Sequence, residues 1–206
     1  MLFLDELPEF NRRVLESLRE PLETGVVAIS RAALQVDYPA CFQLIAAMNP
    51  CPCGYLGEPT GRCRCAPPEI ARYRARISGP LLDRIDLRVE VPVVNSDELL
   101  GERTPADTAM TSAHAARLVR ATRETQLARA GKLNAELSGS ELQDVSRLDR
   151  PCRLLLAQAR TRLALSARGV HRVLRVARTI ADLEGPSGAL RATHLAEALQ
   201  LRRNGA

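Results

Sequence analysis

A short apolar run that ends in two adjacent carboxylates opens the chain and sets the first constraint on its fold. Residues 1–4 are Met, Leu, Phe and Leu, and Asp5 and Glu6 follow directly. An uninterrupted apolar run is typical of a strand buried in a parallel sheet. Open α/β sheets bind ligands beyond the carboxyl ends of such strands, which is where Asp5 and Glu6 lie. The alternative is an N-terminal edge strand followed by an acidic helix cap.

A second apolar run, residues 42–47, predicts another central parallel strand, and it is followed by Met48 and Asn49. A polar Asn at the mouth of a buried strand is well placed to orient a ligand or a water molecule. A loop-capping role fits the local sequence equally well.

The segment between the two runs predicts a helix and a β-hairpin. Gly25 ends the helix. Apolar residues recur before it at helical spacing, namely at Val14, Leu15, Leu18 and Leu22. Residues 26–30 and 34–38 are short strand-like runs, and residues 31–33 form the turn between them.

Two closely spaced pairs of cysteines lie in a loop rich in glycine and proline, at Cys51, Cys53, Cys63 and Cys65. The N-terminal residues lack the pattern of a secretory signal, and clustered cysteines then favour metal binding over disulfides. Four thiolates suit Zn²⁺ in a closed structural site. Because Cys-x-Cys is tighter than the usual Cys-x₂-Cys, reduced non-ligating thiols and redox disulfides stay open as alternatives. Cys41 and Cys152 are predicted to be small core residues.

Arg84 stands near Asp83 and Asp86, just before a predicted strand over residues 85–91. A basic helix over residues 69–77 precedes it. An Arg between two carboxylates is expected to be held rigidly, and a local Arg–carboxylate network is the plain interpretation.

The second half predicts a polar linker over residues 95–106 and then a helical domain. Helical periodicity covers residues 108–129, 150–165, 168–184 and 191–203. Residues 151–206 hold ten arginines against three acidic residues. This imbalance indicates either an anionic partner, such as a nucleotide or nucleic acid, or a solvated basic helix face.

Composition excludes several classes of protein. A length of 206 residues allows one large domain or two small ones. With 46% hydrophobic and 26% charged residues, the chain is neither collagen-like nor disordered. No apolar run approaches the ~18 residues of a membrane span, so we expect no membrane partner. Aromatic residues make up 3%, which predicts a mostly aliphatic core.

Taken together, three segments resemble an AAA+ ATPase: Leu2-Phe-Leu-Asp-Glu6, Ala46-Ala-Met-Asn-Pro50 and Leu81-Leu-Asp-Arg-Ile-Asp-Leu87. Longer segments resemble its magnesium-chelatase-like subgroup called ComM or YifB, over residues 5–10, 29–32, 48–57, 78–87 and 166–182. The double Cys-x-Cys insert separates this subgroup from true magnesium chelatase subunits.

The resemblance implies a role for each matching residue of the core. Asp5 and Glu6 match the Walker B acids, so Asp5 is expected to hold Mg²⁺ and Glu6 to polarise the attacking water. Asn49 matches sensor 1, which orients that water near the γ-phosphate of ATP. Arg84 matches the arginine finger, which acts on the nucleotide of the neighbouring subunit.

The fold implied is α/β plus α: an incomplete P-loop AAA+ core followed by an all-helical lid. The core is a parallel sheet with a presensor hairpin at residues 26–38. We expect residues 1–95 to be the C-terminal half of the core, with the cysteine insert at 51–65. Residues 96–206 are expected to be a lid of the magnesium chelatase C-terminal type.

One part of the family pattern is missing, because Gly-x₄-Gly-Lys-Ser/Thr occurs nowhere in the sequence. The only Gly-Lys pair, Gly131-Lys132, lacks the preceding Gly, the Ser/Thr and the preceding strand. We therefore expect the chain alone to be inactive toward ATP, as the product of a mis-called start or of a truncated gene.

The intact protein implied is a bacterial, cytoplasmic, hexameric ring that uses ATP and Mg²⁺ to remodel DNA, as a branch-migration helicase in natural transformation. In its lid, Arg168 best matches sensor 2, and Arg175 is the second candidate. One alternative is a zinc-stabilised, non-catalytic module that binds nucleic acid or protein. Another is a magnesium chelatase subunit, against which the cysteine insert argues.

Overall fold

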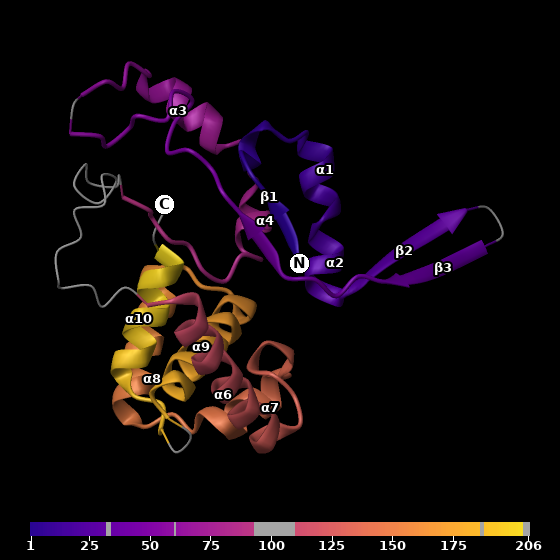
Figure 1. Cartoon of the computed structure of the whole chain (residues 1–206), viewed down its shortest axis with the longest axis vertical. Helices are drawn as coiled ribbons and strands as arrows, with labels where there is room; N and C mark the ends of the chain where they lie inside the picture. Colours follow the sequence, from indigo (N-terminus) through magenta and orange to yellow (C-terminus); the bar gives the residue numbers. More distant parts are fainter. Residues whose placement is uncertain (32–33, 60, 93–109, 186–187, 204–206) are drawn as a thin grey trace. The chain divides into compact units, whose positions relative to one another are not determined.

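The computed structural model divides the chain into two compact units, Met1–Ile85 and Asp86–Ala206 (Figure 1). It describes residues 1–31, 34–59, 61–92, 110–185 and 188–203. The predicted linker at 95–106 and the predicted boundary after residue 95 lie outside the described residues.

Two short strands of the first unit, β1 (Leu2–Leu4) and β4 (Leu44–Ala46), pair in parallel. Leu2 lies opposite Leu44, and Leu4 lies opposite Ala46. Parallel neighbours need a long crossover, which the intervening helices and hairpin provide. The predicted parallel sheet is therefore confirmed for these two runs.

The expectation that both faces of these strands are buried is wrong for the described part of the chain. Phe3 is 58% exposed and its register partner Ile45 is 40% exposed. Side chains alternate across a strand, so Leu4 lies on the opposite face from Phe3. Leu4 packs against a small core, which consists of Leu7, Leu15, Ile77 and Leu81. The described residues cover one face of the sheet and leave Phe3 and Ile45 in solvent.

The single helix predicted before Gly25 is two helices, α1 (Arg12–Ser17) and α2 (Arg19–Thr24), which meet at Leu18. Pro21 lies in the first turn of α2. It has no backbone N–H to continue the hydrogen-bond ladder of α1, although its ring is tolerated at a helix start. The prediction of a helical segment before Gly25 is confirmed, and the prediction of one continuous helix is wrong.

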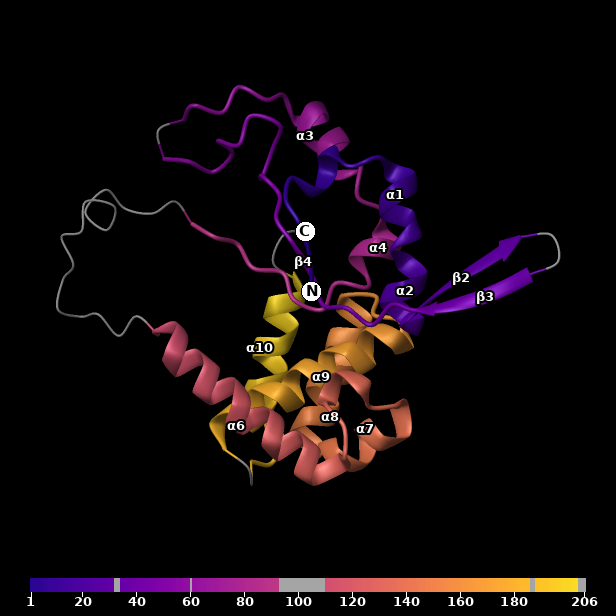
Figure 2. The same cartoon turned by 45° about the vertical axis from the view of Figure 1, so that its right-hand side comes forward.

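The predicted hairpin is confirmed as β2 (Val26–Arg31) and β3 (Leu34–Pro39), which pair antiparallel from Val26↔Pro39 onward. Figures 1 and 2 show it as a two-stranded ribbon that extends from the end of α2 away from the rest of its unit. Residues 32–33 of the predicted turn lie outside the described part of the chain. The side chains of Val27 and Ile29 on β2 and of Tyr38 on β3 are exposed.

The predicted strand over residues 85–91 is wrong, because these residues have no regular secondary structure. A strand needs a neighbour that takes its backbone hydrogen bonds. The N–H of Arg88 donates instead to the carbonyl of Leu201 near the end of α10 (Ala192–Arg203), at 2.7 Å. The preceding basic segment forms α3 (Pro67–Arg74), and α4 (Gly79–Leu82) follows.

From residue 110 onward, the described part of the second unit consists of helices and the short segments that join them. Its helices are α6 (Ser112–Ala130), α7 (Gly139–Ser146), α8 (Arg150–Arg162), α9 (Ala167–Glu184) and α10. All but α7 coincide with predicted segments, apart from residues 108–109, which lie outside the described residues. Helix α7 begins with a capping box, in which Ser138 accepts from the N–H of Glu141 and the Glu141 side chain accepts from the N–H of Ser138. That Ser-x-x-Glu signal was readable in the sequence.

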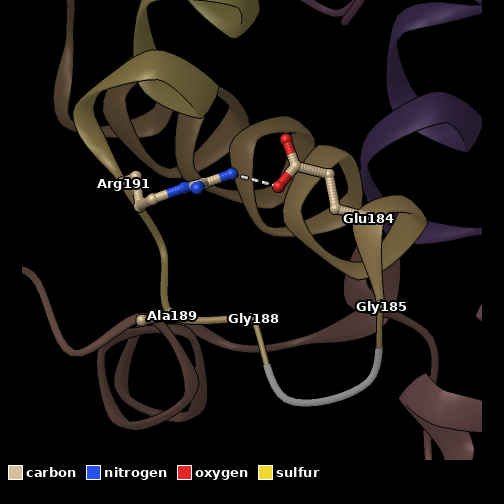
Figure 3. A pocket seen from close by; sticks show the side chains of 5 residues that line it. All are labelled: Glu184, Gly185, Gly188, Ala189 and Arg191. Carbon is tan, nitrogen blue, oxygen red and sulfur yellow. Dashed lines mark hydrogen bonds and ion pairs between the residues drawn. The ribbon is translucent and has the colours of Figure 1, made fainter.

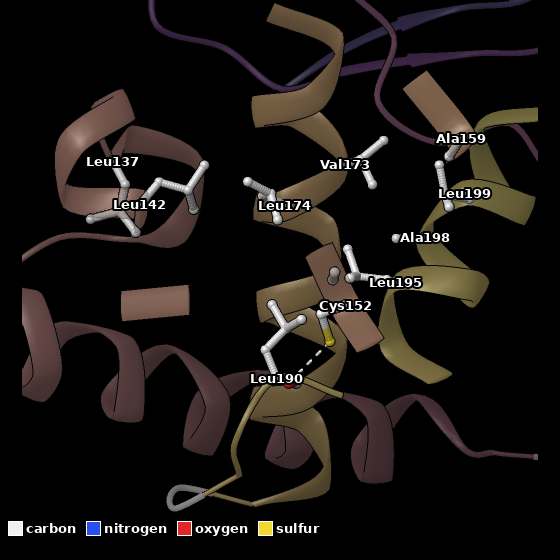
Figure 4. Close-up of a cluster of buried hydrophobic side chains, with 11 residues drawn as sticks. Leu137, Leu142, Cys152, Ala159, Val173, Leu174, Leu190, Leu195, Ala198 and Leu199 are labelled. Carbon is white, nitrogen blue, oxygen red and sulfur yellow. Dashed lines mark hydrogen bonds between the residues drawn. The ribbon is translucent and has the colours of Figure 1, made fainter. Parts of the chain in front are cut away.

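Helix α9 packs against α10, α6 and α7 at the centre of this unit. The core between these helices is aliphatic, as predicted, and Figure 4 shows its side chains converging, among them Leu142, Val173, Leu174 and Leu195. Cys152 is fully buried in this core, as predicted. Cys41 is exposed, against the prediction, because it follows β3 where the chain leaves the hairpin.

Candidate functional site

The carboxyl ends of β1 and β4 form one edge of the small sheet. The N–H of Ala47 donates to the carbonyl of Leu4 at 2.9 Å, and the N–H of Leu7 donates to the carbonyl of Ala47 at 2.9 Å. These bonds hold the two chain segments side by side just beyond the strands. The edge is therefore fixed by backbone contacts and not by its polar side chains.

Three predicted site residues follow these strand ends, Asp5 and Glu6 after β1 and Asn49 after β4. All three are exposed to solvent. Carboxylate and amide oxygens are the donors that Mg²⁺ prefers, so the edge carries a donor set that fits this ion. The structure brings these three residues to the same edge of the sheet.

The backbone turns sharply at Glu6, which has φ 51° and ψ 46°. This left-handed conformation costs a non-glycine residue of order 1–3 kcal/mol and concentrates at functional sites. The N–H of Glu6 donates to Oδ1 of Asp5 at 2.8 Å, which supports the turn. The turn starts a 3₁₀ segment, Leu7–Glu9, whose Leu7 and Pro8 are buried while both carboxylates stay in solvent.

Tyr73 is a residue at this edge that the sequence analysis missed. It lies on α3, is 6% exposed and contacts the backbone of Asn49. Burial raises the pKa of its hydroxyl, and the carboxylates of Glu9 and Glu6 raise it further. Tyr73 is the one aromatic residue of α3, and no motif in the sequence connects it with Asn49.

Arg84 is held by residues of α2 and α4. It forms an ion pair with Glu23, its Nε donates to the carbonyl of Arg19 at 3.0 Å, and its Nη1 donates to the carbonyl of Pro80 at 2.8 Å. The hollow beside it, about 410 Å³ in volume, is lined by residues of α1 and α2 and by Arg84 itself. Arg84 thus forms its ion pair with Glu23, a residue that local sequence did not indicate, while Asp86 pairs with Arg172.

The predicted lid arginines lie on α9 in the second unit. Arg168 is exposed in the first turn, which Ser166 caps by accepting from the N–H of Gly169 at 3.0 Å. Arg172 pairs with Asp86 at 2.7 Å. Nη2 of Arg175 donates to the carbonyl of Leu137 at 2.6 Å, and burial lowers the pKa of this guanidinium. Arg175 is thus bound to the backbone of its own unit.

The four clustered cysteines come together in space. Their sulfur atoms all lie within 4.8 Å of one another. The Sγ–Sγ distances are 3.4 Å for Cys51–Cys53, 3.8 Å for Cys51–Cys63 and 3.7 Å for Cys53–Cys63. A tetrahedral ion with metal–sulfur bonds of about 2.3 Å has sulfur–sulfur edges of about 3.8 Å. A disulfide needs about 2.05 Å, and the four cysteines are free thiols in this structure.

The backbone supports charge on one of these thiols. The N–H of Tyr55 lowers the pKa of Cys53 to about 6, and the neighbouring Cys51 thiol adds to this effect. The contact with Cys53 in turn raises the pKa of Cys65 to about 12. A thiolate at Cys53 with three further cysteine sulfurs beside it is a group that a cation would convert into four ligands.

The loop that carries the cysteines closes on itself. Nε of Arg62 donates to Glu58 at 2.8 Å, and its guanidinium lies 4.6 Å from the ring centre of Tyr55. Nε of Arg74 on α3 donates to the carbonyl of Pro50 at 3.4 Å, just before Cys51. These contacts tie both cysteine pairs to one compact loop beside Asn49.

A smaller hollow of about 210 Å³ lies in the second unit between the end of α9 and the start of α10 (Figure 3). The ion pair of Arg191 with Glu184 spans it. The buried His194 caps α10 by accepting from the N–H of Arg191 at 3.1 Å, and its Nε2 lies 3.0 Å from Glu184. This hollow contains none of the predicted site residues.

Comparison with known proteins identifies the family. The model of the family described as magnesium chelatase, subunit ChlI, matches residues 1–99, and the model of magnesium chelatase, subunit ChlI C-terminal, matches residues 109–202. The chain belongs to the magnesium chelatase ChlI-like family. The resemblance inferred from its motifs is confirmed.

Within this family the chain is similar to proteins of the ComM and YifB type. It is 47% identical to Competence protein ComM of Haemophilus influenzae over 203 residues, which cover 98% of this chain and 38% of that protein. It is 43% identical to Uncharacterized protein YifB of Escherichia coli over 203 residues, 98% of this chain and 39% of that protein. A Mycobacterium tuberculosis relative is 40% identical over 210 residues, 100% of this chain and 40% of that protein.

The chain therefore spans about two fifths of the length of these relatives. Among the described helices, none is both long and apolar enough to cross a membrane.

Proposed function

We propose that this chain is the part of a ComM-like AAA+ ATPase that runs from the Walker B acids to the helical lid. The observation that carries the proposal is the convergence of Asp5, Glu6 and Asn49 at one sheet edge. One Asp5 oxygen accepts the N–H of Glu6, which leaves the other for Mg²⁺. The bound ion would neutralise phosphate charge. Glu6 would accept a hydrogen bond from the attacking water, and Asn49 would orient that water.

The phosphate cradle of such an ATPase has to come from outside this sequence, which contains no P-loop. The greater length of the relatives supports that source. The exposed Phe3 and Ile45 are an apolar sheet face on which a helix of the missing part of the core would pack. The chain by itself is then expected to bind ATP weakly and not to turn it over.

Two arginines complete the proposed site. Arg84 would act on the nucleotide of a neighbouring subunit in a homo-oligomeric ring, for which a hexamer is the expected size. Arg168 is a better candidate than Arg175 for the lid contact with nucleotide. Arg175 is partly buried, whereas Arg168 is exposed to solvent at the start of α9.

DNA remodelling is the proposed use of this ATPase, in a cytoplasmic protein. Support comes from the likeness to a competence protein and from the hairpin β2–β3, whose Val27, Ile29 and Tyr38 side chains are exposed. A ribbon that stands apart from its own unit suits contact with a strand threaded through a ring. A branch-migration helicase in natural transformation is the specific activity proposed.

We also propose that the four clustered cysteines hold a structural Zn²⁺. Sulfur–sulfur distances of 3.4–3.8 Å approach the edges of a Zn–thiolate tetrahedron. A second candidate function rests on the same cluster: a zinc-stabilised, non-catalytic module that binds nucleic acid or protein. A magnesium chelatase subunit is less favoured, because the cysteine insert separates the ComM type from it.

One experiment distinguishes the motor from the binding module. ATP binding and turnover are measured for this chain and for a version extended at its N-terminus by the upstream half of a relative. We expect ATP binding in the extended protein only, and we expect Glu6→Gln to abolish turnover while binding persists. Arg12→Gln, an exposed change on α1, is the matched control. An extended protein that binds no ATP would favour the non-catalytic module.

A further inference from the structure

We propose that a metal ion bound by Cys51, Cys53, Cys63 and Cys65 positions Asn49. Metal occupancy would then set the geometry of the sheet edge with Asp5 and Glu6. The inference rests on the zinc site and the role of Asn49 proposed above. It adds a physical link between the two.

The covalent link between Asn49 and the cluster is short and stiff. Pro50 alone separates Asn49 from Cys51, and its ring fixes one backbone dihedral. Cys51 is fully buried, so the start of the loop has little freedom once its sulfur is bound. A displacement of the Cys51 sulfur therefore has to be absorbed within two residues of the Asn49 side chain.

A second link runs through space. The backbone between Cys51 and Gly54 forms a turn in which the N–H of Gly54 donates to the carbonyl of Cys51 at 3.0 Å. A side-chain carbon at Gly54 would lie 3.9 Å from Cγ and Oδ1 of Asn49. The turn that carries the first cysteine pair thus lies beside the amide of Asn49, with room for little more than a side-chain carbon between them.

The second cysteine pair, Cys63 and Cys65, connects the cluster to α3, which contacts Asn49 through Tyr73. Cys65 lies two residues before α3, the helix that places Tyr73 against the backbone of Asn49. An ion between the two pairs closes the loop from Cys51 to Cys65, and closing a loop removes disorder from the segment it spans. Asn49 is then held by the turn on one side and by α3 on the other.

Hydrogen exchange followed by mass spectrometry tests the link in the chain itself, loaded with zinc or stripped by a chelator under reducing conditions. Two amides report on the edge: Ala47, bonded to Leu4, and Gly54, bonded to Cys51. The amide of Gly25, bonded to Pro21 at the end of α2, is the control in the same unit. We expect exchange at Ala47 and Gly54 to rise at least tenfold without zinc, while exchange at Gly25 changes less than twofold.

Variants separate the link from general loss of structure. Cys65→Ser removes one ligand far along the chain from Asn49, and we expect it to reproduce the zinc-free exchange at Ala47. Cys65→His keeps a zinc ligand and should restore zinc content and slow exchange. Cys41→Ser changes an exposed cysteine outside the cluster, and it should alter neither the zinc content nor the exchange at Ala47.

Each outcome has a distinct meaning. Bound zinc with unchanged exchange at Ala47 on its removal would overturn the inference and leave the zinc site standing. A chain that binds no zinc by metal analysis would overturn both proposals. If exchange rose equally at Ala47 and Gly25 on zinc removal, the metal would stabilise the whole unit and not position Asn49. That result would also overturn the inference.

Discussion

Asp182 is the residue on which the polar interior of the second unit depends. Its carboxylate is fully buried and accepts hydrogen bonds from Arg129 at 2.6 and 2.8 Å, from Arg178 at 2.8 and 3.0 Å and from Asn134 at 2.9 Å. Arg178 is itself buried, and its Nη2 also donates to the carbonyl of Gly188. These partners come from α6, α9 and the segment before α7, so one side chain joins three parts of the unit.

Replacing Asp182 by Asn should destabilise the second unit by about 3–5 kcal/mol, because Arg178 would remain buried without its counter-charge. Urea unfolding, followed by circular dichroism, measures the loss. Glu184→Gln on the same helix is the matched control, since its ion pair with Arg191 is about half exposed and should contribute less than about 1 kcal/mol. Equal losses for the two variants would contradict this account.

The same carboxylate should make stability depend on acid pH. Burial raises the pKa of Asp182, but hydrogen bonds from Arg129 and Asn134 outweigh burial and bring it below the ordinary value. Such a group stabilises the fold above the pKa of the unfolded chain, about 3.9, and this contribution is lost as pH falls through the folded pKa. The difference in unfolding free energy between wild type and Asp182→Asn should therefore shrink below about pH 4. A difference that grows as pH falls would contradict the sign.

At the scale of elements, Gly25 is the joint between α2 and the hairpin. It ends α2 with φ 71°, and its carbonyl accepts from the N–H of Ala40 at 2.6 Å, where the hairpin returns. A side-chain carbon at this position would lie 2.8 Å from Sγ of Cys41. Both the backbone angle and the space therefore require glycine here.

Gly25→Ala should cost more stability than Gly57→Ala, although both residues have positive φ. The backbone penalty is about 1–2 kcal/mol at each position. Only Gly25 adds a clash, because nothing lies within 4 Å of a side-chain carbon at Gly57. Unfolding curves of the two variants measure the difference. Cys41→Ala in the Gly25→Ala background should recover part of the lost stability. No recovery would show that the new side chain does not clash with Sγ of Cys41.

At the scale of the whole molecule, the exposed face of β1 and β4 should govern association of this chain. Phe3 and Ile45 are register partners on that face, 58% and 40% exposed. An uncovered apolar face beside open strand edges favours pairing with another copy.

Ile45→Thr should therefore reduce self-association of the chain, measured by light scattering over a concentration series. Thr keeps the β-branched shape that suits a strand and removes part of the apolar surface. Val119→Thr, at an apolar residue of α6 that is 53% exposed, is the matched control. An equal effect of both changes would show that general surface hydrophobicity, not the sheet face, drives association.

Local patterns in the sequence determined much of this protein: the separate strands β1 and β4, the hairpin, most helices of the second unit, the closely spaced cysteines and the family. Those features depend on side-chain periodicity and motif spacing, which are properties of neighbouring residues. The break at Leu18, the pairing of Arg84 with Glu23 and the place of Tyr73 beside Asn49 depended on the tertiary structure. Arg84 and Glu23 are 61 residues apart, so no local pattern could join them. The absence of a strand over residues 85–91 has the same cause, because a strand exists only where a distant segment is positioned to accept its hydrogen bonds.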